Sequence, residues 1–393
     1  MIYNLLVSGF AICVYLVLHT YILYPLFLIL TTSPSKESNN EIFTQEELPE
    51  LEILIAAYNE EKVIGEKLKT IFESKYPTEK IFVHIGSDAS TDKTNSIVEE
   101  FAAKFPGQIK LRIFPGRTGK SGIINQLASE SEKKILILSD ANVMFSEFCI
   151  TEMMKHFKNE KIKLVAANII KFSPNNEGIA EQEKSYLKME NRIKLLESIR
   201  WKTIMGAEGG CYAIRKENFS PVPKNFFMDD FYITLNVIEN KGLAIFEPQS
   251  ICHEDVPNSG AEEFKRKVRI SVGNFQNLMR YKKLLWPFWK GSGFAFLSHK
   301  VLRWLTPFLF LKAFLILSFL CVMETTWIWI WLGELFLFLT PFLNFIFERA
   351  NMPFPILRYF GHFMHMNFAL LKGFFVYARG VNSNVWTPTQ RNK

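Results

Sequence analysis

Charged residues are absent from the start of the chain: no Asp, Glu, Lys or Arg precedes Lys36. The apolar run from Ile2 to Leu30 is long enough to cross a hydrocarbon core about 30 Å thick, which requires roughly 20 helical residues. A cleaved signal peptide would need a basic start, a shorter apolar core and a small-residue cleavage site. Here the start is uncharged and the core is too long, so we expect residues 1–32 to form a retained transmembrane anchor.

Cysteine is scarce and scattered along the chain. The five cysteines show neither the spacing of a metal site nor a disulfide framework, which fits a reducing compartment; they stand at positions 13, 149, 211, 252 and 321. A P-loop is also missing, because the glycine-punctuated segment GRTGKSGIIN lacks the full spacing of that motif. These absences argue against a disulfide-rich secreted protein and against a P-loop nucleotide-binding protein.

Apolar residues are abundant instead, at 48% of the 393 residues, and they concentrate at the two ends. In the C-terminal third, residues 304–323 and 327–347 each have the length of a spanning helix. A third stretch, residues 360–377, contains two histidines and a lysine, so we expect it to be interfacial or spanning. We assign residues 296–393 to a C-terminal membrane region.

Much of the net charge of +7 lies just before these apolar runs, between Lys265 and Lys283. Basic residues beside a spanning helix favour the cytoplasmic side of the membrane, and no nucleic-acid recognition motif accompanies them. We therefore expect an integral protein of the inner or plasma membrane that contacts membrane lipid, places its catalytic domain in the cytoplasm and has no nucleic-acid partner.

The middle of the chain alternates between strand-like and helix-like segments, after a polar linker at residues 33–49. This alternation is typical of an α/β domain with a mostly parallel central sheet, which we place at residues 50–295. In such sheets, ligands bind beyond the carboxyl ends of the strands. The expected strands are LEILIAAY (51–58), KIFVHIGSD (80–88), IKLRIF (109–114), KKILILSD (133–140) and IKLVAANII (162–170).

Polar side chains follow three of these strands. Tyr58 and Glu60 follow the first strand, Asp88 follows the second, and Asp140 and Asn142 follow the fourth. Each group alone fits a turn, because Asp and Asn side chains bond to nearby backbone. Together at one sheet edge, they favour a site for Mg²⁺ or Mn²⁺ bound with a diphosphate, since these cations prefer oxygen ligands.

A basic loop lies between the third and fourth strands. Arg117 and Lys120 stand where the segment GRTGKSGIIN opens a helix, and a helix start with basic side chains favours anions. A solvated surface loop is the alternative interpretation of this segment taken alone.

Several motifs in a fixed order resemble those of a known family. The chain is similar to the family 2 glycosyltransferases of GT-A fold, a Rossmann-like α/β fold, in their membrane-embedded branch. The resemblance covers roughly residues 50–280, and the closing NVWTPTQR, with its W-x-P-T-x-R pattern, also resembles that branch. The motifs are AAYNEEKVIGEKL, GSDASTDKT, RTGKSGIINQ, SDAN, GAEGGCYAIRKE, MDDFYI and RKVRISVGNFQ.

This resemblance implies transfer of a sugar from a nucleoside diphosphate donor, with a UDP-sugar expected, and with inversion at the anomeric carbon. It implies Asp230 as the catalytic base, which agrees with the need for a carboxylate to take the proton of the acceptor hydroxyl. The other implied roles are donor binding by Ala57, Tyr58, Glu60, Asp88, Lys120, Asn125 and Asp140, metal binding by Asp140 and Asn142, and contacts to the diphosphate or acceptor by Asp229, Arg266 and Arg269.

The chain departs from the family pattern at three positions. Asn142 replaces the second acid of the metal motif, and Ser87 stands where many relatives have an acid. Ile270 stands where synthases of long β-linked chains have a tryptophan, which argues against processive synthesis and leaves single or few additions open.

Three functions remain open from the sequence. The first is a hexosyl- or N-acetylhexosaminyltransferase acting on a glycan or lipid-linked acceptor, in polysaccharide or glycolipid biosynthesis; its export or assembly partners are not specified. The second is an inactive GT-A scaffold that partners a polysaccharide synthase. The third is a nucleotidyltransferase.

Overall fold

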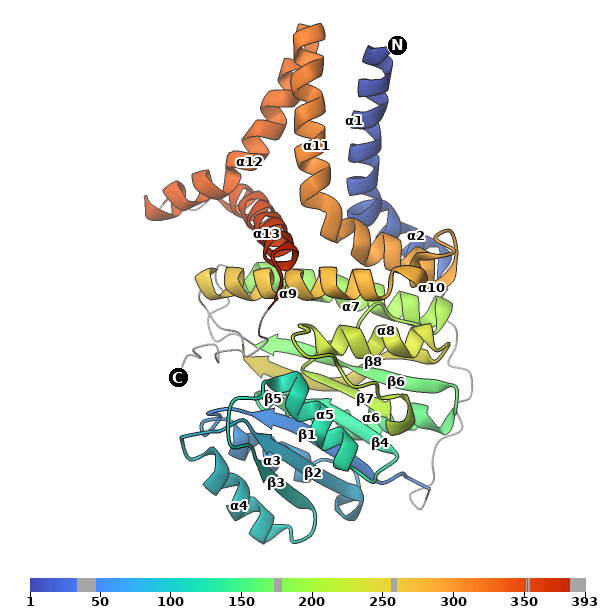
Figure 1. Ribbon diagram of the computed structural model, residues 1–393, viewed down its shortest axis with the longest axis vertical. Coiled ribbons are helices and arrows are strands. Elements are labelled where there is room, and N and C mark those ends of the chain that lie inside the picture. The colour runs from blue at the N-terminus through green and yellow to red at the C-terminus, as the bar shows by residue number, and fades with distance from the viewer. Residues whose placement is uncertain (34–46, 173–178, 256–259, 351, 353, 382–393) are drawn as a thin grey trace. The chain divides into compact units, whose positions relative to one another are not determined.

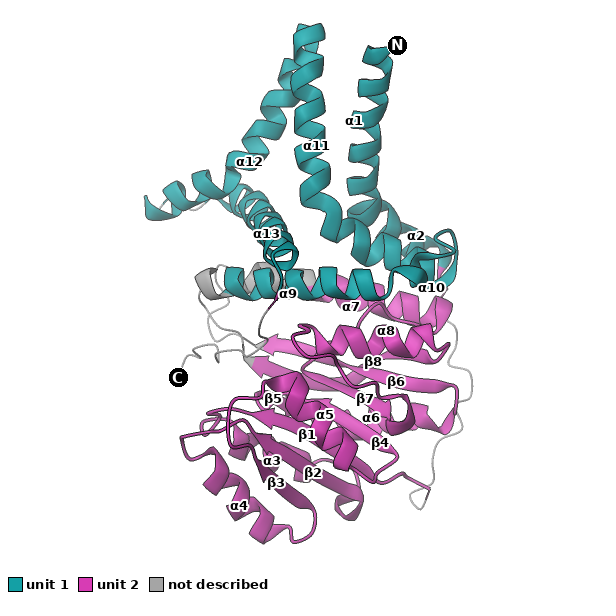
Figure 2. Ribbon diagram, viewed as in Figure 1, with its two compact units in different colours: residues 1–31, 259–380 teal, residues 32–258, 381–393 magenta. Residues whose placement is uncertain are grey.

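The computed structural model describes residues 1–33, 47–172, 179–255, 260–350, 352 and 354–381. The chain divides into two compact units: residues 1–31 with 259–380, and residues 32–258 with 381–393 (Figure 2). Residues 259–295, which we expected in the catalytic domain, group with the apolar helices in this division. Most of the predicted linker and the closing W-x-P-T-x-R motif lie outside the described residues.

The second unit is built on one eight-stranded sheet in the order β3-β2-β1-β4-β7-β6-β8-β5 (Figure 1). Strands β3, β2, β1 and β4 are parallel, whereas β7 runs antiparallel to both β4 and β6. Strand β8 is parallel to β6 and antiparallel to β5. The strands are β1 Leu51–Ala57, β2 Ile81–Ser87, β3 Ile109–Ile113, β4 Ile135–Ser139, β5 Val143–Phe145, β6 Ile162–Phe172, β7 Cys211–Arg215 and β8 Leu243–Asp255.

Apolar residues in the strands and helices form the core of this unit. The β1, β2 and β4 segments are rich in Ile and Leu, and a parallel sheet with both faces covered favours such near-continuous apolar runs. Helices pack against this sheet and bury residues such as Leu68, Val98 and Met153. The helices are α3 Ile64–Phe72, α4 Thr94–Lys104, α5 Lys120–Glu130, α6 Cys149–Met154, α7 Ile179–Trp201 and α8 Asp229–Glu239.

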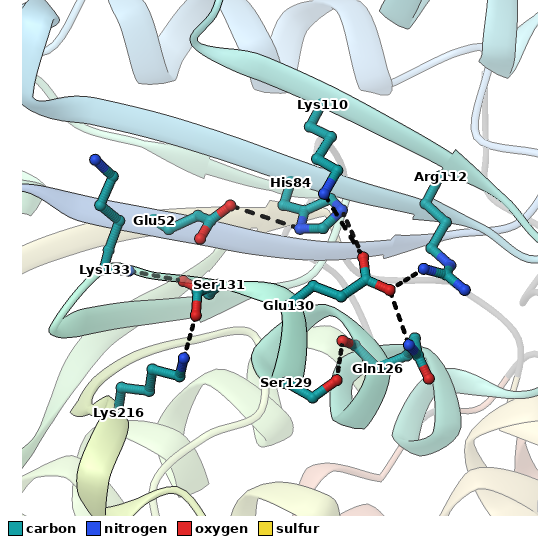
Figure 3. A network of polar contacts seen from close by, with 10 residues as sticks. All are labelled: Glu52, His84, Lys110, Arg112, Gln126, Ser129, Glu130, Ser131, Lys133 and Lys216. Atoms are coloured by element: carbon teal, nitrogen blue, oxygen red, sulfur yellow. Dashed lines mark hydrogen bonds and ion pairs between the residues drawn. The ribbon is translucent and has the colours of Figure 1, made fainter.

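A polar network fixes the C-terminal end of α5 against the parallel strands (Figure 3). The Glu130 carboxylate accepts hydrogen bonds from Gln126 and Arg112 and lies 3.7 Å from Nε2 of His84 on β2. Burial lowers the pKa of His84 to about 4, and the charges of Lys110 and Arg112 act in the same direction, so the ring is neutral at pH 7. The network therefore holds the helix whose first residue is Lys120.

The first unit is helical, and three of its stretches are long and apolar enough to cross a membrane: Ile2–Thr31, Gly291–Met323 and Thr325–Arg349. The region expected to be interfacial or spanning forms α13, which is not among these three candidates in the described chain. The main helices are α1 Ile2–Leu18, α2 Tyr24–Thr31, α9 Gly260–Arg280, α10 Gly291–Ala295, α11 Leu302–Met323, α12 Ile328–Arg349 and α13 Pro355–Ala378.

Close helix packing holds this unit together. On α11, Leu317 and Leu320 pack against Leu6 and Phe10 of α1. Where α13 meets α9, a Cβ added at Gly373 would lie 2.3 Å from Cβ of Ser271, and the Ser271 hydroxyl donates a hydrogen bond to the Leu370 carbonyl. Only glycine permits this approach.

Candidate functional site

The polar residues predicted at the strand ends lie at one edge of the sheet. Ala57 and Ser87 are paired at the ends of β1 and β2, and the Asp88 amide donates to the Ala57 carbonyl at 2.8 Å. The sheet order changes direction between β1 and β4, so Tyr58 and Asp140 follow the two strands that flank the switch point, where open α/β sheets bind ligands.

Asp88 anchors the basic loop that precedes α5. Its buried carboxylate accepts hydrogen bonds from Nε of Arg117 and from the backbone amides of Thr118 and Gly119, at 3.0, 2.5 and 3.2 Å. Gly119 has a φ of +82°, a left-handed conformation that favours glycine, and it caps the helix that begins at Lys120. Asp88 thus positions the start of the helix that carries Lys120, and its role toward a donor stays a prediction.

Arg117 also covers the ring of Tyr58, with its guanidinium carbon 3.4 Å from the ring centroid. Such a stack forms a flat cation–π surface at the end of β1. Tyr58 and Asp88 therefore contact the same guanidinium, and their roles toward a nucleotide stay predictions.

Lys120 lies between two carboxylates: that of Asp140, which follows β4, and that of Asp229, the first residue of α8. Its Nζ lies 2.7 Å from Oδ1 of Asp140 and 3.8 Å from Oδ2 of Asp229, and it donates to the Gly209 carbonyl at 3.2 Å. Although burial disfavours its charged form, Asp140 and Asp229 raise the pKa of Lys120 above its usual value. The ammonium therefore stays protonated at the centre of this carboxylate cluster.

Asp229 and Asp230 lie in the first turn of α8, and both are buried. The residue before this helix, Met228, has a left-handed backbone conformation with a φ of 60°. Burial raises the pKa of Asp230 to about 7, the Asp229 carboxylate adds to the shift, and Lys120 opposes it. Asp230 is thus poised to accept a proton near neutral pH.

A glycine makes room for this carboxylate. A Cβ at Gly209 would lie 2.9 Å from Oδ2 of Asp230 and 3.4 Å from Nζ of Lys120. Gly209 belongs to the GAEGGCYAIRKE motif, but no pattern in the sequence assigns it a role at the site. Its importance follows from a close approach between segments far apart in the chain.

The residues expected to hold a divalent cation have suitable chemistry. Asp140 supplies a carboxylate, and Asn142 supplies an amide whose Nδ2 lies 3.4 Å from Oε1 of Glu254 on β8. Oδ2 of Asp229 is buried and lacks a hydrogen-bond partner among the described residues. Since three carboxylates (Asp140, Asp229 and Asp230) surround the single ammonium of Lys120, oxygen ligands and negative charge fit Mg²⁺ or Mn²⁺.

Two other predicted donor-binding residues make structural hydrogen bonds. The Asn125 amide donates to the Val222 carbonyl and accepts from the Val222 amide, at 2.8 and 2.9 Å. Glu60 is buried, and its backbone amide donates to the hydroxyl of Thr94. Their roles toward a donor stay predictions.

Arg266 and Arg269 lie three residues apart on α9, in the other unit of the chain. Nη1 of Arg266 lies 3.2 Å from the Glu263 carboxylate. Their expected contacts with a diphosphate or acceptor therefore stay predictions as well.

Comparison with known proteins agrees with this geometry. Residues 52–221 match the family described as Glycosyl transferase family 2. The chain contains a family 2 glycosyltransferase domain. This domain includes the strand ends, the basic loop and the Asp140 motif, and the α8 carboxylates follow it in the chain.

Curated relatives match part of their length. The chain is 34% identical over 122 residues to a beta-monoglucosyldiacylglycerol synthase of Nostoc sp., covering 31% of this chain and 26% of that protein. It is 26% identical over 250 residues to "Probable glycosyltransferase YdaM" of Bacillus subtilis, covering 60% and 57%. The chain thus spans less than two thirds of the length of these relatives.

A solved structure shares the fold over almost the whole chain. The mannosyltransferase PcManGT from Pyrobaculum calidifontis, in complex with GDP-Man and Mn²⁺, superposes with a TM-score of 0.68 at 19% identity. The match covers 94% of this chain and 99% of that one. The predicted GT-A fold of the glycosyltransferase domain, with apolar helices at both ends of the chain, is confirmed.

Proposed function

We propose that this protein is a membrane-bound, metal-dependent, inverting glycosyltransferase. It transfers a hexosyl or N-acetylhexosaminyl group from a nucleoside diphosphate sugar, a UDP-sugar by expectation, to a glycan or lipid-linked acceptor at the cytoplasmic membrane face. The observation that carries the proposal is the cluster in which Lys120 joins Asp140 and Asp229, beside a buried Asp230 whose pKa of about 7 suits a base.

In this mechanism, Asp230 accepts the proton of the acceptor hydroxyl while the hydroxyl oxygen attacks the anomeric carbon of the donor. The bond between that carbon and the diphosphate breaks on the opposite face, which inverts the configuration. Lys120 offers positive charge to the departing diphosphate, and such preorganised charge stabilises the transition state. A divalent cation held by Asp140 and Asn142 would supply further charge neutralisation to the diphosphate.

The relatives support this class of acceptor. The Nostoc relative is described as the synthase of a glucosylated diacylglycerol, and the solved neighbour contains a nucleotide sugar with Mn²⁺. The three candidate spans of this chain agree with an acceptor delivered at a membrane. We therefore propose a glycolipid or a lipid-linked glycan as the product.

A donor screen tests this function. Purified full-length protein in detergent is incubated with a panel of nucleoside diphosphate sugars and membrane lipid extract, with Mn²⁺, with Mg²⁺ or with a chelator. We expect one donor to release its nucleoside diphosphate in the presence of metal. Release of pyrophosphate would instead identify a nucleotidyltransferase, and no turnover with any donor would favour the inactive scaffold.

A further inference from the structure

Three cysteines that are far apart in the sequence meet in the core of the unit that contains the glycosyltransferase domain. Cys149 opens α6, Cys211 opens β7 and Cys252 lies in β8, and all three are fully buried. Their Sγ atoms lie within 4.8 Å of one another, and those of Cys149 and Cys252 are 3.2 Å apart. Three sulfur ligands of one zinc ion, each at about 2.3 Å, would be about 3.8 Å apart in a tetrahedral arrangement.

A buried ammonium lies beside the thiols. Lys67 on α3 is fully buried, and its Nζ donates to the Ser139 hydroxyl at 2.7 Å and to the Val143 carbonyl. No carboxylate lies within ion-pair distance of this Nζ among the residues that the structure describes. Burial lowers the pKa of Lys67 to about 8, whereas the neighbouring Cys211, Cys252, Cys149 and Asp140 act in the opposite direction.

These two observations disfavour the simpler view of the cysteines as small apolar core residues, which is the usual role of buried cysteine. An isolated buried ammonium is costly because it loses its hydration, so a buried positive charge normally has a counterion. Three thiolates, one divalent cation and one ammonium together carry no net charge. Thiolate ligands select soft or borderline cations such as zinc(II) and copper(I) over Mg²⁺ or Mn²⁺.

We propose that Cys149, Cys211 and Cys252 form a structural site for one thiophilic metal ion, with the Lys67 ammonium compensating the excess thiolate charge. The site differs from the oxygen-lined Asp140 site. It also supports that site, because Cys211 is paired with Ser139, the residue before Asp140, and Lys67 bonds to both Ser139 and Val143.

The test is metal analysis of the full-length protein, purified in detergent without chelator. We expect about one zinc or copper ion per chain, measured by inductively coupled plasma mass spectrometry. The double variant Cys149→Ser/Cys252→Ser should lose at least about nine tenths of this metal. The matched control Cys13→Ser/Cys321→Ser changes the cysteines of α1 and α11 and should keep it.

Cadmium binding tests the site independently of what the cell supplies. Protein stripped of metal is titrated with Cd²⁺, and thiolate-to-cadmium absorbance is followed in the ultraviolet. Wild type should bind one Cd²⁺, and Lys67→Met should bind it at least about tenfold more weakly, because a neighbouring compensating charge is lost in a poorly solvated site. Wild type that contains neither zinc nor copper and gives no cadmium absorbance would overturn the proposal, whether or not any variant folds.

Discussion

At the residue scale, the proposed mechanism depends on the protonation state of Asp230. Asp230→Asn keeps the shape of the side chain but cannot accept the acceptor proton, and general-base catalysis contributes about 10²–10⁴-fold. We expect nucleoside diphosphate release to fall by about that factor while the thermal unfolding temperature stays close to that of wild type. Glu217→Gln, an amide substitution at an exposed carboxylate, should leave turnover unchanged. Unchanged turnover in Asp230→Asn would remove the base assignment.

The pH dependence follows from the same residue. The pKa of Asp230 is about 7, raised first by burial and then by Asp229. Because the base acts only when it is deprotonated, we expect kcat/KM to be level above pH 7 and to fall about tenfold for each pH unit below it. In Asp229→Asn, the charge that helps raise this pKa is gone, so the acidic limb should move to lower pH. An acidic limb at the same pH in both proteins would contradict this explanation.

The close approach of Gly209 to the Asp230 carboxylate can be tested by adding a methyl group at this glycine. The added methyl group of Gly209→Ala would lie 2.9 Å from the Asp230 carboxylate, so Asp230 or Lys120 must shift. Since small displacements of catalytic groups cost large factors in rate, we expect kcat to fall by about 10-fold or more. Gly65→Ala on α3 would meet its nearest atom at an ordinary 3.5 Å and serves as the control. Equal kcat values for the two variants would count against the proposed role of Gly209.

The residues of the candidate site were partly predictable from the sequence. Tyr58, Asp88 and Asp140 were placed at one sheet edge because each follows a parallel strand, and the strand pairing confirms this placement. Gly209 and the cysteine cluster could not be predicted, because their importance comes from contacts between distant segments. Cys149 and Cys252 are 103 positions apart, and no spacing rule connects them.

At the scale of elements, sequence patterns located five of the eight strands in the described sheet. The five expected strands correspond to β1, β2, β3, β4 and β6, with ends within two residues. Strands β5 and β7 were not predicted, and for β8 we expected only a strand end at His253, which lies near the end of that strand. β5 has three residues, which is too short for a clear pattern, and both β5 and β7 form where pairing partners such as β8 and β4 lie beside them.

The packing of α9 against α13 provides an element-scale prediction. Gly373→Ala places a methyl group 2.3 Å from Cβ of Ser271, and overpacking of this kind costs typically about 1–3 kcal/mol. Gly333→Ala on α12 is the matched control, because nothing lies within 4 Å of its added methyl group. We expect a lower unfolding temperature in detergent for Gly373→Ala and no loss for Gly333→Ala. Equal temperatures would contradict the packing described here.

At the scale of the whole molecule, membrane insertion and sidedness are proposals that labelling can test. The glycosyltransferase domain has no exposed cysteine among its described residues, since Cys149, Cys211 and Cys252 are buried. In a Cys13→Ser/Cys321→Ser background, a cysteine introduced as Glu217→Cys would therefore be the accessible thiol of the described chain. We expect a membrane-impermeant maleimide to label it in inside-out vesicles and not in intact cells, since basic residues beside spanning helices favour the cytoplasmic side. Labelling in intact cells would show that the domain lies on the opposite side of the membrane and would contradict the proposal.

The ammonium of Lys120 has one further consequence for the molecule. It already neutralises Asp140, so an arriving divalent ion must exchange with a resident positive charge. A diphosphate, which attracts both cations, would favour that exchange. Uptake of the ion and uptake of the donor are then thermodynamically linked, and each should tighten the other by the same factor. The free protein would therefore bind Mn²⁺ weakly, and bound donor would raise its affinity for the ion.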